Sequence, residues 1–405
     1  MKKIPIILIT LFCSYQIAIS QSLERYLKIA ENANPEIEYR ELDQQIFEAK
    51  IDETGNLDNT KFNLGFYVFP PETRLGAQRL NIGVQQSLPW PGTLKAQKSV
   101  AEYKSKEKYY DIAIAKKNLF FNVKKTYYEL YQNAALLNIY KENKQVLDIY
   151  ENMAMGALEN NKAKMSDVLK IQTQKNELHS KLFSVFNTYE ALSRQFNRLL
   201  DRDEDIQLYI PDSLSILDIP IPGDTVTGHP LLRKLDARMT TIAKEQELLR
   251  YEEKPEFSVS LDYIAVSKRK DIFPDANGRD ILMPAIAVSV PVFTKQYDAK
   301  AKRLTLEEKQ TEVQKHNQEQ ILKSQYDLAK AKLKNAILQV VAAQKNKDVI
   351  QRAIDSDLKA YETGKINYDN ILRMQLQKIK YQIMEIQATK EAYIQKAVLE
   401  YLAGE

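Results

Sequence analysis

The chain has 405 residues, of which 58 are Lys or Arg and 54 are Asp or Glu, so its formal net charge is only +4. A single cysteine and 11 glycines exclude a disulfide scaffold and a collagen-like chain, and 44% hydrophobic residues exclude a disordered tail. We expect no helical membrane span, because no run of 18 apolar residues occurs, and the small net charge gives no indication of a nucleic-acid partner.

The first 20 residues have the pattern of a signal peptide. Lys2 and Lys3 precede an apolar stretch that ends in Ala18-Ile19-Ser20, a small-x-small cleavage pattern. We therefore predict an exported protein whose mature chain begins near Gln21. The alternative is a lipoprotein acylated at Cys13, which the large Phe12 directly before it disfavours.

The rest of the sequence contains an internal repeat. The helix start Asn34-Pro35 is matched by His229-Pro230, and residues 157–169 match residues 360–372, a pairing that continues to Gln172 and Gln375. We predict two repeats, residues 21–201 and 229–405, joined by a linker over residues 202–228. That linker holds Pro211, Pro220, Pro222 and Gly223.

Each repeat begins with a moderate helix, which is followed by two strands. Apolar residues alternate with polar or small ones over residues 61–69 and 80–88, and again over residues 256–266 and 281–290. Gln86 falls on the apolar side and is an exception to this alternation.

A long helix and a return helix complete each repeat. Residues 93–158 and 294–361 contain no proline, and apolar residues recur at spacings of three and four. At 1.5 Å per residue, each stretch predicts a helix of roughly 100 Å. The return helices, residues 166–200 and 369–402, would complete hairpins over residues 93–200 and 294–402.

The four strands have the length of strands that cross an outer membrane, with an apolar face for lipid and a polar face for a wet interior. Four strands cannot close a barrel, so several chains would have to contribute; three copies would supply twelve strands. An ordinary soluble sheet is the alternative. Trp90, the only tryptophan, is either a membrane-interface anchor or a turn residue packed on its own hairpin.

The order of these elements and the hairpin turns resemble those of the TolC-type outer membrane efflux proteins. The family turn, roughly Tyr-x-x-Gly followed by Asp-Val-Leu, is matched by Tyr361-Glu-Thr-Gly364 with Asn370-Ile371-Leu372, and by Leu158-Glu-Asn-Asn161 with Asp167-Val168-Leu169. The resemblance implies a mainly α chain with a small β part, in a trimeric α-helical barrel that continues into a 12-stranded transmembrane β-barrel.

The same resemblance implies a function and a set of site residues. The protein would be the exit duct of a tripartite efflux or type I secretion system, in the outer membrane of a Gram-negative bacterium with a large periplasmic part. Its partners would be two further copies, a periplasmic adaptor (membrane fusion protein), an inner-membrane transporter and outer membrane lipid. The periplasmic mouth would involve Asp167, Tyr361, Asp369 and Asn370, and the hairpin turns Asn161, Gly364, Leu169 and Leu372. Asp167 and Asp369 have an alternative role as favourable carboxylates in the first turn of a helix.

No nucleotide-binding, zinc-protease or hydrolase motif occurs, so we expect neither an enzyme nor a cofactor. Met153, Met155 and Met165 are soft ligands that would suit Cu(I), or they make hydrophobic contacts with a partner. If these methionines bind Cu(I), heavy-metal cations are an alternative cargo. The alternative class of function is an exported periplasmic coiled-coil scaffold or adaptor protein.

Overall fold

The computed structural model describes residues 23–160, 163–216, 219–220, 223, 226–362 and 368–404. The expected signal peptide with Cys13, and the expected turn residues Asn161 and Gly364, lie outside the described residues. In chain order the elements are α2 (Pro35–Glu53), β1 (Lys61–Phe66), β2 (Glu72–Thr73), β3 (Gly76–Leu88), α3 (Thr93–Glu159), α4 (Met165–Leu199), the short η1 (Val226–Gly228), α5 (Pro230–Glu252), β4 (Glu256–Ser267), β5 (Ile281–Ser289), α6 (Lys295–Glu362) and α7 (Tyr368–Leu402).

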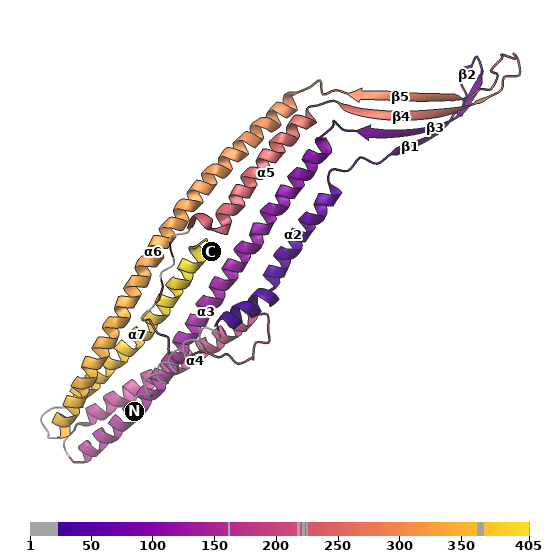
Figure 1. Ribbon diagram of the computed structural model, residues 1–405. Coiled ribbons are helices and arrows are strands. Elements are labelled where there is room, and N and C mark those ends of the chain that lie inside the picture. Colours follow the sequence, from indigo (N-terminus) through magenta and orange to yellow (C-terminus); the bar gives the residue numbers. More distant parts are fainter. Residues whose placement is uncertain are drawn as a thin grey trace, which may run out of the picture. The chain divides into compact units, whose positions relative to one another are not determined.

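The protein is mainly helical with one small antiparallel sheet, as the sequence predicted (Figure 1). The two longest helices, α3 and α6, have 67 and 68 residues. Local signals set where helices begin: the Asn34 side chain accepts the Glu36 N–H at 3.0 Å before α2, and Pro230 occupies the first position of α5. No helix in the described part of the chain is both long and apolar enough to cross a membrane.

The chain forms two compact units, and each unit contains segments from both halves of the sequence. Unit 1 contains residues 1–39, 112–230 and 318–405, and unit 2 contains residues 40–111 and 231–317. The units therefore do not coincide with the two sequence repeats. The reason is that elements of the first half pack beside elements of the second half, as β3 does with β4 and α3 with α7.

Unit 1 has two apolar cores. One lies between α3, α4 and α7 and is built around Leu147, Ile171 and Ile371, each 1% exposed or less. The second surrounds Tyr127 and Phe196, against which Tyr26 packs with its ring edge-on to Phe196 at 5.1 Å. Apolar side chains that recur every three or four residues bring these helices together along their length.

Unit 2 contains the sheet, in which the strands follow the order β1-β3-β4-β5 with all neighbours antiparallel, while β2 pairs with the start of β3. The central pairing, β3 with β4, joins the first half of the sequence to the second. β3 begins at Gly76, four residues before the start of the strand predicted over residues 80–88. Its pairing with β4 has an irregularity between Gln78 and Leu80 that leaves Arg79 opposite no β4 residue.

The helices of unit 2 are held largely by charged side chains. Lys234 of α5 contacts Asp111 of α3 at 2.6 Å, and Lys104 of α3 contacts Glu245 of α5 at 2.7 Å. The small apolar core here, formed by Ile242, Leu249 and Leu304, joins α5 to α6. Packing in this unit therefore depends on ion pairs as well as on apolar burial.

We expect Gly92→Ala to destabilise the protein. Gly92 precedes α3 with φ +100°, and a Cβ there would lie 2.7 Å from the Tyr251 ring. The substitution should cost on the order of 1–3 kcal/mol of unfolding free energy, measured by circular dichroism during denaturation in detergent. Gly156→Ala is the matched control, because nothing lies within 4 Å of its Cβ position in α3; it should stabilise by about 0.5–1 kcal/mol. Equal stability of the two variants would contradict this account of Gly92.

Candidate functional site

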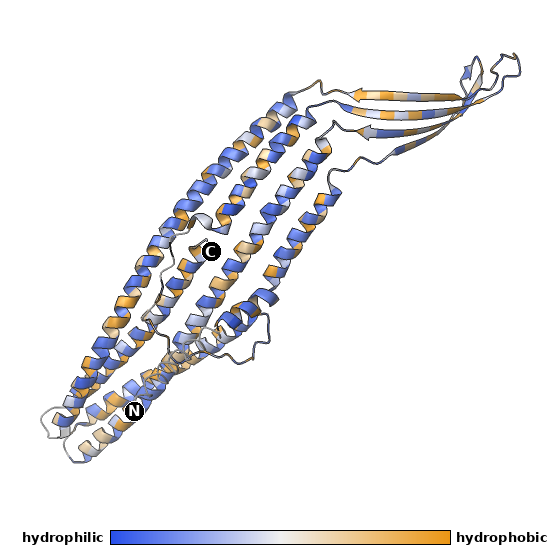
Figure 2. Ribbon diagram, in the orientation of Figure 1, coloured by the Kyte–Doolittle hydropathy of each residue, from blue (hydrophilic) through white to orange (hydrophobic). Residues whose placement is uncertain are grey.

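One face of the sheet is apolar across all four long strands. Side chains directly opposite each other in an antiparallel sheet lie on the same face, so the pairing register defines rows. The rows on this face are Phe66-Leu80-Ala265, Leu64-Ile82-Tyr263-Leu282, Phe62-Val84-Leu261-Pro284 and Leu88-Phe257-Val288. A further row on this face, Gln86-Val259-Ile286, contains one polar residue. We call this surface the apolar sheet face; Figure 2 shows the hydrophobic and hydrophilic residues that follow one another along its strands.

The apolar sheet face is not covered by any other part of the chain that the structure describes. Phe62 is 78% exposed, Phe66 72% and Ile286 75%. The opposite face carries mostly small or polar residues, including the row Lys61-Gln85-Ser260-Ala285 and the residues Asn63, Gly83 and Asp262. One face of the sheet is therefore suited to contact with hydrocarbon, and the other face to contact with water.

Gln86, the exception in the strand pattern, has a local explanation. Its side-chain nitrogen donates to the Asp58 carbonyl at 2.9 Å and to the Ser87 carbonyl at 3.0 Å, and its side-chain oxygen accepts from the Thr60 hydroxyl at 2.6 Å. These bonds satisfy the amide and hold the segment that enters β1 against β3. The polar residue on the apolar face therefore orders the start of the sheet.

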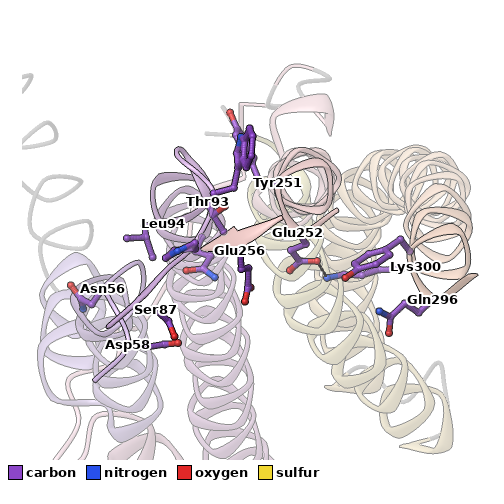
Figure 3. A pocket seen from close by; sticks show the side chains of 14 residues that line it. Asn56, Asp58, Ser87, Thr93, Leu94, Tyr251, Glu252, Glu256, Gln296 and Lys300 are labelled. Carbon is purple, nitrogen blue, oxygen red and sulfur yellow. Dashed lines mark hydrogen bonds and ion pairs between the residues drawn. The ribbon is translucent and has the colours of Figure 1, made fainter. Parts of the chain in front are cut away.

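The junction between sheet and helices in unit 2 contains a cavity of about 490 Å³. Its lining includes Trp90, Thr93, Tyr251 and the ion pair between Lys300 and Glu252 (Figure 3). The Trp90 ring stacks on Phe257 at 5.9 Å between centroids, and Phe257 belongs to the apolar sheet face. Trp90 is half-buried, so the structure is compatible with both of its expected roles; the anchor role stays a prediction.

Asp167 caps the start of α4. The Lys164 N–H donates to the Asp167 carboxylate at 3.1 Å, and the Asp167 N–H donates to the Lys164 carbonyl at 2.9 Å. This reciprocal arrangement satisfies two backbone groups at the helix end, which is the alternative role expected for this carboxylate. Its place at a channel mouth stays a prediction.

Asp369 makes an ion pair with Lys170, which joins α7 to α4. The Lys170 ammonium donates to Asp369 at 2.9 Å, and Arg373 lies 3.4 Å from the other carboxylate oxygen. The hydrogen bond from Lys170 lowers the pKa of Asp369, and the same bond raises the pKa of Lys170. Both shifts favour the charged forms, so the pair contributes at neutral pH; it is lost when the pH falls through the pKa of Asp369 or rises through that of Lys170. We call this contact the tip ion pair.

The other expected mouth and turn residues divide between core and surface. Tyr361 packs against the core of α3, α4 and α7, and Leu372 is buried in it. Leu169, the equivalent of Leu372 in the first repeat, is 54% exposed. The Asn370 side-chain oxygen accepts a hydrogen bond from Arg373 on the same helix.

The three methionines do not face a common point. Met153 packs against the α3, α4 and α7 core, whereas Met155 is 42% and Met165 56% exposed. Two positions along a helix differ by about 200°, so Met153 and Met155 point to opposite sides of α3. Within the described residues, no group of three His, Cys, Asp or Glu is placed to hold a metal ion.

Two contributors were missed by sequence reasoning. Lys170 forms the tip ion pair, and Arg269 joins the segment between β4 and β5 to β2 by donating to the Thr73 carbonyl at 3.3 Å. Arg269 also donates to Asp271 of its own segment at 2.8 Å. Asp369, the partner of Lys170, lies 199 residues away along the chain, and Thr73 lies 196 residues from Arg269. The repeat alignment, which brings residue 170 near residue 373, is the one sequence signal that could have indicated the first of these contacts.

No known protein-family model matches the sequence, and no curated protein matches it either. Solved structures match it in fold. The outer membrane protein VceC from Vibrio cholerae is 12% identical with a TM-score of 0.76, over 95% of this chain and 97% of that one. The Neisseria gonorrhoeae outer membrane channel MtrE, in its open state, is 14% identical with a TM-score of 0.75, over 95% and 89% of the two chains.

The Campylobacter jejuni outer membrane channel CmeC gives a similar result, with 13% identity and a TM-score of 0.74 over 95% of this chain and 86% of that one. At these identities the likeness is one of fold, and it covers nearly the whole chain. The chain therefore has the fold of the TolC-type outer membrane efflux channels, which the repeated hairpin motif predicted.

Proposed function

We propose that this protein is an outer membrane channel and acts as the exit duct of a tripartite efflux or type I secretion system. It would be a homotrimer in the outer membrane of a Gram-negative bacterium, with a large periplasmic part. A periplasmic adaptor and an inner-membrane transporter would deliver the cargo, and transport through the duct would be passive. The observation that carries this proposal is the apolar sheet face.

An exposed apolar surface of this extent needs a cover. Burying apolar area contributes about 25 cal/mol per Å², so water is a poor environment for Phe62, Phe66, Ile286 and their neighbours. Lipid is the cover that fits, since the face is apolar apart from Gln86 while the opposite face carries mostly small or polar residues. Strands of 12 and 13 residues, such as β4 and β3, are long enough to cross a thin bilayer when tilted.

The sheet also has two open edges, formed by β1 and β5. Unpaired backbone groups in hydrocarbon cost several kcal/mol each, so an open sheet is not stable there. Four long strands from each of three copies would close a 12-stranded barrel, with the polar face towards a water-filled interior. Closure therefore supports a complex of several copies.

The helices also favour a complex of several copies. α6 buries Leu333 and Val340 on one side, yet on its other side Leu328 is 56%, Leu338 67% and Val349 53% exposed. A helix that is apolar on two sides packs against two neighbours. A second copy of the chain would supply the neighbour that the single chain lacks.

The tip ion pair would help to close the periplasmic mouth. It joins the return helices of the two hairpins directly after their turns, where the resemblance places Asp167, Tyr361, Asp369 and Asn370. An adaptor that binds the hairpin ends and separates α4 from α7 would relax this closure.

The alternative function is a periplasmic scaffold or adaptor that never enters a membrane. It would leave the apolar sheet face without a cover, which is the reason we do not favour it. A heavy-metal cargo would need ligands along the route. The divergence of Met153 and Met155 on α3 argues against a metal relay formed by the three methionines.

The first experiment measures conductance of the purified protein in planar lipid bilayers, together with its mass in detergent. We expect discrete channel openings from a species of three chains, because only a closed ring of strands provides a water-filled path. A monomer or dimer that gives no current and stays soluble without detergent would overturn the channel and favour the scaffold.

A second experiment tests which face of the sheet contacts lipid. Ile286→Arg places a charge on the apolar sheet face and should cost about 2–4 kcal/mol, so assembly in the outer membrane should fall sharply. Ala287→Arg, one residue along on the opposite and equally open face, is the matched control and should assemble normally. Heat-sensitive oligomers in membrane extracts give the measurement. Equal assembly of both variants would argue against lipid on the apolar face.

A third experiment tests the tip ion pair. Lys170→Ala should raise passive uptake of large antibiotics modestly, because an exposed pair contributes little in each copy but all copies lose it together. Lys170→Asp combined with Asp369→Lys should restore closure. Lys181→Ala, at an exposed lysine farther along α4, is the control. Unchanged uptake in Lys170→Ala, with normal oligomer levels, would remove the tip ion pair from the closing mechanism.

A further inference from the structure

The two helix hairpins correspond residue by residue. α4 and α7 each have 35 residues, and both their first and their last residues are 203 positions apart. The preceding long helices, α3 and α6, also end 203 positions apart, at Glu159 and Glu362. A contact that one hairpin makes can therefore be compared with the equivalent residues of the other.

Within one chain, the hairpins meet through a buried amide contact between α3 and α7. The Gln375 side-chain nitrogen donates to the Asn143 side-chain oxygen at 2.7 Å, and both residues are 3% exposed. The Asn143 nitrogen donates in turn to Gln382 at 3.1 Å and to the Ile139 carbonyl at 2.7 Å. This cluster lies inside the apolar core of α3, α4 and α7, and we call it the intrachain amide contact.

The repeat-equivalent residues are Asn346 on α6 and Gln172 and His179 on α4. The local sequences also agree, since Asn143-Lys144-Gln145-Val146 corresponds to Asn346-Lys347-Asp348-Val349. All three equivalents are exposed in the single chain. The Asn and Gln side chains that are buried between α3 and α7 thus have exposed equivalents, Asn346 on α6 and Gln172 on α4. Exposed apolar residues lie near them: Leu338 and Val349 on α6, and Leu169 and Phe183 on α4.

We propose that α6 of one copy packs on α4 of the next copy, with Asn346 hydrogen-bonded to Gln172, so that the intrachain amide contact is repeated between copies. This inference rests on the homotrimer of the proposed function. The occupant of the exposed α6 face is a second copy, because only another copy presents the α4 face that matches it by the repeat. Each copy would use α6 on one side and α4 on the other, which is a head-to-tail contact that can close into a ring.

The hydrogen-bonding groups at the proposed contact are compatible. The Gln172 side-chain nitrogen donates to Glu151 on α3 at 2.8 Å within its own chain. Its side-chain oxygen then accepts from the Asn346 nitrogen. This reverses the direction seen between Gln375 and Asn143, which is allowed because every amide has both a donor and an acceptor. His179, in the place of Gln382, offers a ring nitrogen as a further partner for Asn346.

The amide pair would fix the axial register of the two helices. A single buried Asn in a coiled coil specifies register, because any shift leaves a buried polar group without a partner. The apolar surface on α4 is too small to fix the register alone. Asn176 and Ser180 of α4 occupy the positions that correspond to the buried Ile379 and to Ile383 of α7.

Paired cysteines test this inference in the full chain with Cys13→Ser, which removes the only native cysteine. Asn346→Cys combined with Gln172→Cys should give covalent dimers and trimers on denaturing gels after oxidation, since a disulfide needs Cα atoms within about 7 Å. Each single variant should remain monomeric on the gel. Asn143→Cys combined with Gln375→Cys is the matched intrachain control and should give only a monomer band of altered mobility.

Asn346→Cys with Asn187→Cys, about four turns farther along α4, tests the register. Cross-linking of this pair as strong as that of the Gln172 pair would overturn the proposed register. A trimer in detergent in which the intrachain pair forms but the Asn346 and Gln172 pair does not would overturn the intercopy contact and leave the channel standing. A monomer in detergent would instead overturn the proposed oligomer itself.

A charge variant keeps the test independent of cysteine chemistry. Asn346→Glu with Gln172→Glu should lower the temperature at which the oligomer dissociates, because like charges would face each other between copies. Asn346→Lys with Gln172→Glu should recover most of that loss. Both double variants contain Gln172→Glu, so the loss of its intrachain hydrogen bond to Glu151 is common to the two and cancels in the comparison. Equal dissociation temperatures for the two double variants would contradict the pairing.

Discussion

The exposed apolar face of an open sheet is the constraint on which the rest of this structure depends. A four-strand sheet with Phe62, Phe66 and Ile286 outside and two unpaired edges cannot persist alone in water or in lipid. In the proposed homotrimer, closure with strands from other copies would satisfy both the edges and the apolar face. The helices would then form a ring of matching symmetry, for which each copy needs two different, complementary sides.

The internal repeat supplies those two sides from one design. β3 and β4 already pair across the two halves of the sequence, and α3 already packs against α7, so each chain contains one complete example of the contact that the repeat can make. The unused equivalents are the edges β1 and β5 and the faces of α4 and α6. The compact units mix segments of both halves for the same reason, since each unit contains contacts between an element of the first half and an element of the second.

The sequence alone was sufficient for the element types and their order, because strand alternation and helix periodicity are local properties. It did not indicate the irregularity at Arg79 or the hydrogen bonds that make Gln86 acceptable on the apolar face, since both depend on which residue of another strand or loop lies opposite. Lys170 was missed for a related reason: its carboxylate partner is on the other hairpin. Asp167 caps α4, which is the alternative role that the sequence indicated, and its role at a mouth stays a prediction.

The two kinds of hairpin contact need not be equally strong. The intrachain contact buries Ile379 and Ile383 of α7 beside the amide cluster, whereas α4 offers Asn176 and Ser180 at the equivalent positions. Less apolar area means a smaller hydrophobic contribution, so a larger share of the intercopy contact would rest on the amide pair and on charges. The tip ion pair, by contrast, forms within one chain. Its repeat equivalent cannot form between copies, because Ser166 occupies the position that corresponds to Asp369. A channel built in this way would open at its mouth when Lys170 and Asp369 separate, because that contact joins the two hairpins of each copy directly after their turns.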